Sequence, residues 1–345
     1  MNKIVRILLL IACLLLYWDR SFASGNSHNG NIVFADDLVK AICVENWDTN
    51  GDGELSYDEA AYVTDLGGVF RGKDITQFYE LNYFTGLTVI GEGVFDGCHN
   101  LVSIIIPNNV TTIAQYAFYD DNKLENISLP SKLNSIEKRA FARCSSLKSV
   151  TCHAFSPPVL GENVFYMVSL SDATLYVKPR RVYHYTNDEV DNVTTEWGAF
   201  GTITELTWPK SYELSENGRT LVYWYGKETS IDMTANPELN EVRVIGENAF
   251  YNDDDLEIIV FPEKLRIIGE SAFFYSDALH SVTIPLSVER IEGWAFAGCS
   301  SMTDVVVLNP KTTLGQQCFR TCTSLTNVQL PADLRVLPER VFGNC

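Results

Sequence analysis

Apolar residues recur along this chain with a period of 23 residues, far longer than the period of a single helix or strand. Each period holds a phenylalanine, an aliphatic residue five positions before it and, in most periods, another aliphatic residue six positions after it. The phenylalanines are Phe95, Phe118, Phe141, Phe250, Phe273, Phe296, Phe319 and Phe342. A fixed period of this length is typical of stacked supersecondary units that bury their apolar faces against one another. The sequence therefore predicts a solenoid.

Each repeat also contains a short segment in which apolar and polar residues alternate, for example residues 124–130. Such alternation predicts a β-strand with one buried side. Several of these segments end in proline, which a strand end tolerates because proline has no N–H to donate. We therefore expect a mainly β solenoid of 23-residue repeats with short turns.

The repeats fall into two groups. Residues 67–152 are expected to form a first array with an atypical cap repeat at its start, and residues 241–345 a second array that ends within a repeat. Residues 153–240 are interpreted as a modified repeat followed by a hairpin. Asn217-Gly218 between two apolar runs is a strong hairpin signal.

The N-terminus resembles an export signal. Residues 1–23 combine a basic start, an apolar run over residues 7–16 and a small-x-small cleavage pattern at residues 21–23. The run is shorter than the roughly 20 residues that a membrane-spanning helix needs. The alternative is that Cys13, which follows Leu-Ile-Ala, is lipidated and anchors an outer-membrane lipoprotein. Both interpretations predict an exported protein, secreted or at the cell surface, with membrane contact only in the second.

Residues 32–66 are predicted to form a single helix-loop-helix unit with a twelve-residue loop. The loop has oxygen-bearing side chains at positions 1, 3, 5, 9 and 12, a glycine at position 6, and a backbone carbonyl available at position 7. This is the pattern of an EF-hand calcium loop. The residues expected to hold Ca²⁺ are Asp48, Asn50, Asp52, Glu54, Ser56 and Glu59.

Two interpretations of this loop stay open. Regulatory EF-hands usually occur in pairs, and only one such loop is found here, so a structural Ca²⁺ site that fixes the helices against the first repeat is favoured. The alternative is an acidic, glycine-rich turn that caps a helix without binding metal.

Net charge and motif content narrow the function. The formal net charge is −18, which argues against nucleic acid as a partner because phosphate binding requires clustered lysine and arginine. The sequence has five histidines without metal-ligand spacing, and it contains no HExxH, GxSxG or phosphate-binding loop motif. We therefore expect a protein without enzymatic activity.

Five of the nine cysteines share one repeat position, three residues after the phenylalanine. They are Cys98, Cys144, Cys299, Cys322 and Cys345. A cysteine that recurs at an inward position packs as a small apolar residue, so a buried column is favoured over disulfides. For the last three, which lie in successive repeats, the disulfide state stays open.

Two surfaces are candidates for ligand binding. The first is the outward column of the predicted strands, represented by Ser128, Thr151, Thr283 and Gln329. The alternative interpretation of this column is ordinary strand surface with high β-propensity. The second is an aromatic cluster that includes Trp197 and Trp224, which either stacks on sugars or seals the junction between the arrays.

The unit Ile-Gly-x-x-Ala-Phe-x-x-Cys-x-x-Leu-x-x-Val-x-Ile-Pro, seen at residues 245–250 and 291–299, resembles the BspA-type leucine-rich repeat of bacterial surface proteins. The resemblance extends from about residue 75 onward. It implies a leucine-rich-repeat solenoid and an exported adhesin or surface binder of extracellular proteins or glycans, without enzymatic activity. The alternatives are a glycan-handling surface component that uses the aromatic junction and a calcium-dependent assembly module.

Overall fold

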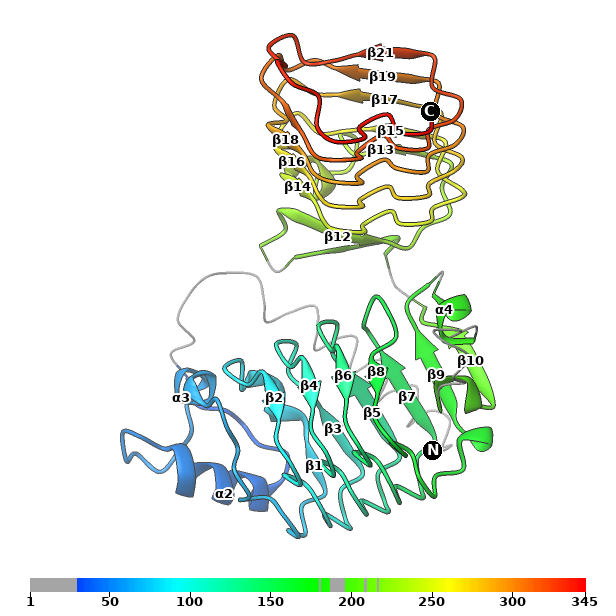
Figure 1. Ribbon diagram of the computed structural model, residues 1–345. Coiled ribbons are helices and arrows are strands. Elements are labelled where there is room, and N and C mark those ends of the chain that lie inside the picture. The colour runs from blue at the N-terminus through cyan, green and yellow to red at the C-terminus, as the bar shows by residue number, and fades with distance from the viewer. Residues whose placement is uncertain (1–29, 180, 187–195, 208–209, 216) are drawn as a thin grey trace. The chain divides into compact units, whose positions relative to one another are not determined.

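Each half of the chain forms its own β-solenoid (Figure 1). The computed structural model describes residues 30–345 except 180, 187–195, 208–209 and 216, so the expected signal segment and Cys13 lie outside the described residues. The first unit extends to Thr207 and the second begins at Trp208. Each unit has a separate apolar core, and the predicted solenoid is confirmed.

The first unit contains two parallel sheets that run along the solenoid. The larger sheet has the order β1 (Gln77–Phe78), β3 (Ser103–Ile105), β5 (Asn126–Leu129), β7 (Ser149–Cys152), β9 (Thr174–Val177) and β10 (Thr202–Glu205). The smaller sheet has the order β2 (Val89–Ile90), β4 (Thr112–Ile113), β6 (Ser135–Ile136) and β8 (Val159–Leu160). The helices are α2 (Asp37–Trp47), α3 (Tyr57–Tyr62), α4 (Val182–Thr186) and the short 3₁₀ helices η1 (Tyr79–Tyr83), η2 (Leu170–Asp172) and η3 (Glu196–Ala199).

The second unit repeats this plan. One sheet has the order β13 (Ser230–Asp232), β15 (Ile258–Val260), β17 (Ser281–Ile284), β19 (Asp304–Val307) and β21 (Asn327–Gln329). The other has the order β11 (Tyr212–Leu214), β12 (Thr220–Trp224), β14 (Val244–Ile245), β16 (Ile267–Ile268), β18 (Arg290–Ile291) and β20 (Thr313–Leu314). The 3₁₀ helix η4 (Leu239–Glu241) precedes β14. Strands β11 and β12 are antiparallel, which confirms the predicted hairpin.

The recurring phenylalanines form a continuous stack inside each solenoid. In the first unit, the ring of Phe118 lies 5.1 Å from the rings of both Phe95 and Phe141. In the second unit, the ring of Phe273 lies 4.7 Å from Phe250 and 4.9 Å from Phe296. The aliphatic residues five positions earlier pair in register in the small strands, as in Ile90, Ile113 and Ile136. Each repeat thus supplies one side chain to each buried column.

A second set of backbone hydrogen bonds joins the turns that carry these phenylalanines. The N–H of Phe95 donates to the carbonyl of Ala117 in the next repeat at 2.9 Å, and Phe118 donates in the same way to Ala140 at 2.8 Å. At Phe165 the acceptor is instead the Glu196 side chain, whose Oε2 lies 2.9 Å from the Phe165 nitrogen. Glu196 therefore caps the last turn of this series.

The cysteines three residues after the phenylalanines are buried at positions 98, 144, 299 and 322, as predicted, whereas Cys345 is exposed. Each thiol donates to the carbonyl of a phenylalanine in the preceding repeat, for example Cys144 Sγ to Phe118 O at 3.1 Å. Ser276 fills the same position and donates to Phe250 O at 2.7 Å. In the described structure the eight cysteines carry free thiols. In these repeats the position holds a small side chain that donates to a backbone carbonyl.

The boundary expected after residue 152 falls inside the larger sheet of the first unit, because β9 and β10 continue that sheet to Glu205. The unit boundary at residue 208 lies within the segment that the sequence marks as irregular, residues 153–240. The sequence pattern did not predict the last strands of the first unit, because β10 does not follow a phenylalanine of the 23-residue series.

Candidate ligand-binding faces and the calcium loop

The outward residues of the first unit's larger sheet align in a column across neighbouring strands. Ser128 of β5 lies opposite Thr151 of β7, and the column continues to Ile105 on one side and Tyr176 on the other. Ser128 and Thr151 are half-buried, and the Ser128 hydroxyl lies 3.1 Å from Nε2 of His153. The structure therefore places two of the predicted binding residues side by side on a face of hydroxyl, aliphatic and aromatic side chains.

The equivalent column of the second unit is more apolar. Thr283 of β17, Val306 of β19 and Gln329 of β21 lie opposite one another, so Val306 separates the two predicted binding residues. On β15, Ile258 is 49% exposed and Val260 is 46% exposed. Apolar surface on a rigid sheet favours contact with a macromolecule over chemistry on a small molecule.

Trp197 and Trp224, considered as a sugar-stacking platform, are buried. Trp197 is 0% exposed, its Nε1 donates to the Pro158 carbonyl at 2.9 Å, and its ring lies 5.9 Å from Phe165. Trp224 is 5% exposed and stacks on Phe250 at 5.7 Å. Neither indole has a face open to solvent, so the structure contradicts a surface platform at these positions. Each ring closes the apolar core of its own unit.

The predicted calcium loop lies between α2 and α3, as expected from the sequence. Gly53 has φ +81°, in the left-handed region that the sharp turn at position 6 of an EF-hand loop requires. Asp48 accepts two backbone hydrogen bonds, from Gly51 to Oδ1 at 2.7 Å and from Gly53 to Oδ2 at 2.8 Å. The first turn of the loop is therefore held by its own carboxylate.

Glu59, the last residue of the loop, is also engaged with the backbone. Its Oε2 accepts from the N–H of Ser56 at 2.9 Å and its Oε1 from the N–H of Thr49 at 2.8 Å. These bonds, that from Ser56 first, lower the pKa of Glu59 to about 2. Ser56 in turn accepts from the Glu59 N–H at 3.2 Å, which completes a capping box at the start of α3.

The donors fit calcium better than their arrangement does. The oxygen set of Asp48, Asn50, Asp52 and Glu59 has the chemistry that Ca²⁺ prefers. Among the residues that the structure describes, however, no three His, Cys, Asp or Glu side chains lie close enough together to hold a metal ion. The carboxylates at both ends of the loop bind backbone N–H groups instead.

The pairing partner of the loop is a segment that the sequence did not reveal. The N–H of Ile32 donates to the carbonyl of Leu55 at 2.8 Å, and Tyr57 donates to Gly30 at 3.3 Å, so Asn31 and Ser56 form an antiparallel bridge. Leu55 is position 8 of the loop. An isolated β-bridge before α2 thus supports the loop, although no period or motif in the sequence marks it.

The helical unit is bound directly to the first repeat. Asp36 caps α2 through Leu38 N at 2.9 Å, and its Oδ2 accepts from both N and Oγ1 of Thr76 at 2.7 Å. Burial alone would raise the pKa of Asp36, but the hydrogen bonds from Thr76, Val39 and Leu38 together outweigh burial and leave the pKa lowered. Trp47, which directly precedes the loop, packs its ring 5.5 Å from Phe84. The helical unit that carries the loop therefore contacts the solenoid core directly.

A second buried carboxyl lies at this contact. Glu80 Oε1 accepts from the N–H of Ala35 at 2.9 Å, while Oε2 is buried and has no hydrogen-bond partner among the described residues. Burial, opposed by the backbone bonds, raises the pKa of Glu80. The helical unit is thus held by two carboxyl groups whose pKa values shift in opposite directions.

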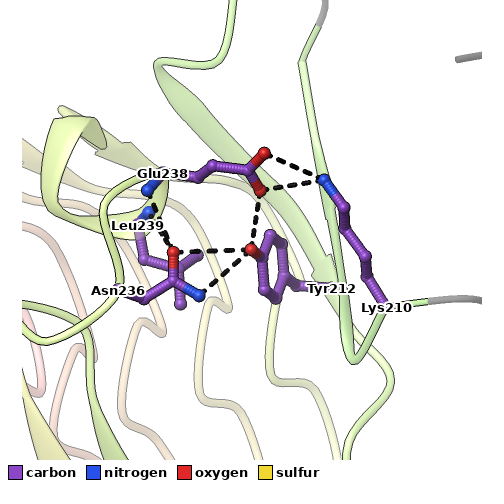
Figure 2. A network of polar contacts seen from close by, with 5 residues as sticks. All are labelled: Lys210, Tyr212, Asn236, Glu238 and Leu239. Carbon is purple, nitrogen blue, oxygen red and sulfur yellow. Dashed lines mark hydrogen bonds and ion pairs between the residues drawn. The ribbon is translucent and has the colours of Figure 1, made fainter.

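A polar network fixes the start of the second unit (Figure 2). Lys210 Nζ lies 2.9 Å from both carboxylate oxygens of Glu238, and the Tyr212 hydroxyl donates to the same carboxylate at 2.7 Å. Asn236 donates to the Tyr212 hydroxyl at 3.1 Å and accepts from the N–H of Leu239 at 3.2 Å. The bond from Tyr212, followed by that from Lys210, lowers the pKa of Glu238. This arrangement ties β11 to the turn before η4 and is structural.

The repeat geometry agrees with a match to a known family. The family model described as BspA type leucine rich repeat region matches residues 68–192 and 236–345, in six copies. The chain belongs to the BspA-type leucine-rich-repeat family. The two matched segments cover more than half of the sequence, and each includes the phenylalanine column of one unit.

The solved structures to which this chain is similar include leucine-rich-repeat proteins. A leucine-rich-repeat protein of T. pallidum is 21% identical over 70% of this chain and 72% of that chain, with a TM-score of 0.24. A leucine rich cell surface protein of Faecalibacterium prausnitzii is 21% identical over 70% of this chain and 83% of that chain, with a TM-score of 0.31. A leucine-rich repeat protein of Eubacterium ventriosum is 21% identical over 73% of this chain and 72% of that chain, with a TM-score of 0.34.

A search of curated proteins found no match to this BspA-type sequence. None of the helices in the described part of the chain has the length and apolarity that crossing a membrane requires.

Proposed function

We propose that this protein is an exported, non-enzymatic binding protein that contacts extracellular proteins or glycans at the cell surface. The observation that carries the proposal is the alignment of uncharged outward residues on a parallel sheet of each unit, with Ser128 opposite Thr151 in the first unit and Thr283 opposite Val306 in the second. Such an extended face suits a partner of macromolecular size. The export-signal pattern at residues 1–23 supports the location.

The test is a binding screen of the purified protein against extracellular matrix proteins and glycans in millimolar calcium. For any ligand found, Thr151→Lys places a cation on the outward column and should weaken binding by about tenfold, equivalent to about 1.4 kcal/mol. Ser131→Lys is the matched control, since Ser131 is exposed after the end of β5. Equal affinity in both variants would exclude the first sheet as the binding face, and turnover of a ligand would overturn the non-enzymatic assignment.

We also propose that the loop beginning at Asp48 binds Ca²⁺ as a structural ion. Asp48, Asn50, Asp52, Ser56 and Glu59 would contribute side-chain oxygens. Glu54 would contribute its backbone carbonyl, which leaves its side chain for the ion pair with Lys40 at 2.7 Å. Binding would hold the loop in one geometry. Because Trp47 packs against Phe84, an ordered loop would also stabilise the first repeat.

Calcium should therefore raise the thermal stability of the first unit. Extracellular calcium modules bind with a Kd of about 10⁻⁴ to 10⁻³ M, so about 10 mM Ca²⁺ should stabilise by roughly 1.4–2.7 kcal/mol. For a unit of this size that is a rise in melting temperature of roughly 3–11 °C over EDTA.

The informative quantity is the calcium-dependent shift of each variant, because Asp48 and Glu59 also hold the loop without metal. Asp48→Ala and Glu59→Ala should abolish the shift, whereas Asp58→Ala, at a loop position that supplies no ligand, should keep it. If the wild-type protein melts at the same temperature in calcium and in EDTA, the loop is a helix cap and not a metal site.

A further inference from the structure

The turns of the second unit carry a group of aromatic side chains on the outside of the solenoid. We call Tyr251, Phe274, Tyr275 and Trp294 the turn patch. Phe274 is in contact with all three of the others: its ring centroid lies 5.5 Å from Tyr251, 4.4 Å from Tyr275 and 5.8 Å from Trp294. The four residues come from three successive repeats, so the patch is one continuous surface that follows the solenoid axis.

The Tyr275 ring packs against Gly298 of the next repeat. A Cβ at Gly298 would meet three carbons of the Tyr275 ring, at 2.4, 2.8 and 3.1 Å. The neighbouring residue, Ala297, is equally small and is buried. Tyr275 is nonetheless 47% exposed. The ring thus contacts Gly298 while nearly half of the side chain stays open to solvent.

The fold does not require aromatic residues at these positions. Tyr275 has φ +57° and Trp294 has φ +58°, in the left-handed region where glycine and asparagine are favoured. The corresponding positions one repeat earlier and later hold Asn252 and Gly298 for Tyr275, and Asn248 lies at the Trp294 position two repeats earlier. A bulky ring in this conformation costs stability, and burial does not explain why it is present.

The rim of the turn patch is polar. The Arg320 guanidinium lies 5.3 Å from the centre of the Trp294 ring, and its Nη1 donates to Gln317 Oε1 at 2.8 Å. Tyrosine hydroxyls and the indole N–H add polar edges to the apolar ring faces. The surface therefore combines flat apolar faces with hydrogen-bonding groups around them.

We propose that the turn patch binds a neutral glycan chain. Pyranose sugars have one face of C–H groups, which packs on an aromatic ring, and a periphery of hydroxyls, which pairs with polar groups at the rim. Two repeat spacings of about 4.8 Å give the patch a length of roughly 10 Å, enough for about two sugar rings. An acidic glycan is disfavoured because the chain has a net charge of −18.

This inference rests on the proposed extracellular binding function for its setting, but it uses a different surface. The patch lies in the turns of the second unit, whereas the proposed protein-binding columns lie on the sheets. Loss of glycan binding in a patch variant, with retention of sheet-dependent binding, would therefore separate the two proposals.

The experiment is isothermal titration calorimetry of the purified protein with neutral hexasaccharides of glucose, mannose and N-acetylglucosamine. A sulfated chondroitin hexasaccharide serves as the anionic arm. At least one neutral oligosaccharide is expected to bind, and Tyr275→Ala and Trp294→Ala should each weaken it by about tenfold or more. Gly298→Ala should also weaken it, because the added methyl displaces the Tyr275 ring that remains present.

Two controls separate ligand contact from folding. Tyr275→Phe keeps the stacking face and should bind within about threefold of wild type, and Tyr62→Ala removes a tyrosine that is 86% exposed outside the patch and should have no effect. Circular dichroism melting verifies that each variant is folded. The proposal is overturned if no neutral oligosaccharide binds, if the sulfated one is preferred, or if binding survives both alanine variants.

Discussion

Asp121 occupies the position that neighbouring repeats fill with cysteine, and replacing it by cysteine should stabilise the first unit. Its side chain is fully buried; Oδ1 accepts from the N–H of Cys98 at 2.8 Å, while Oδ2 has no hydrogen-bond partner among the described residues. In contrast, the thiol of Cys144 donates to the Phe118 carbonyl at 3.1 Å. Asp121→Cys removes the unpartnered oxygen and offers the donor that this position uses elsewhere.

The magnitude follows from these bonds. Relief of a buried polar group without a partner is worth about 1–3 kcal/mol, and the new thiol donor adds somewhat less than the 0.5–1.5 kcal/mol of an ordinary hydrogen bond. The lost bond to the Cys98 N–H costs a similar amount, although that N–H also donates to the Phe95 carbonyl at 3.0 Å. The net gain should be about 1–3 kcal/mol, or roughly 2–12 °C in melting temperature.

The gain should depend on pH. Burial, followed by the charges of Asp96 and Asp120, raises the pKa of Asp121 well above its ordinary value, despite the bond from Cys98. The pKa of Asp121 is therefore higher in the folded protein than in the unfolded chain. Its carboxyl group stabilises the wild-type fold fully below the unfolded-state pKa of about 3.9, and this stabilisation is lost as pH rises through the folded-state pKa. The advantage of Asp121→Cys should therefore grow as pH rises. The thiol of Cys98 does not add to this pH dependence, because burial and the Asp121 charge raise its pKa to about 12.

Differential scanning calorimetry at a series of pH values, with reductant to keep thiols free, measures this effect. Asp121→Asn should show the same pH dependence relative to wild type, since it is also neutral. Asp172→Asn is the control, because Asp172 is exposed, is not among the charges that raise the pKa of Asp121, and should change stability by no more than about 0.5 kcal/mol. A lower melting temperature for Asp121→Cys, or a gain that is identical at pH 5 and pH 8.5, would show that Oδ2 has a partner and refute the reasoning.

Two further predictions concern the solenoid interior. Phe118→Ala should destabilise the first unit, and Phe273→Ala the second, by about 3–5 kcal/mol each, measured as a shift of the corresponding calorimetric transition; a loss below about 1 kcal/mol would mean that the rings are not packed as a column. Glu196→Ala removes the acceptor for the Phe165 N–H and should cost about 1–3 kcal/mol, with faster amide hydrogen exchange at Phe165, whereas Glu196→Gln, which keeps an acceptor, should cost less. Unchanged exchange at Phe165 in the alanine variant would show that Glu196 does not cap this turn.

The solenoid was predictable because its signal is repeated. One side chain per repeat fills each buried column, so Phe118 and Ile113 are marked by many equivalents along the chain and not by their own environment. The helices of the calcium-loop unit were also predictable from local patterns: α2 and α3 begin within one residue of Asp36 and Ser56, which act as their N-caps.

Contacts that occur only once in the structure, and not in every repeat, could not be predicted from the sequence. The pairing of residues 30–32 with the loop, the bonds from Thr76 to Asp36, and the burial of Trp197 each depend on residues that meet only after folding. Aromatic content marked Trp197 and Trp224 as surface candidates because composition does not distinguish a ring that ends a core from a ring on the outside. The turn patch was missed for the converse reason: its rings lie at positions that the repeat pattern leaves unspecified.

The turns explain how this fold separates stability from recognition. Backbone bonds from each turn to the next, such as Phe273 N–H to Ala295 O at 2.7 Å, hold the left-handed residues in place whatever side chain they carry. The positions therefore accept Arg139, Trp294 and Gln317 as well as asparagine. Interior phenylalanines cannot vary in this way, because each contacts its equivalents in both neighbouring repeats. Variants of the turn patch should consequently change glycan affinity with little change in melting temperature, and variants of the phenylalanine column should do the reverse.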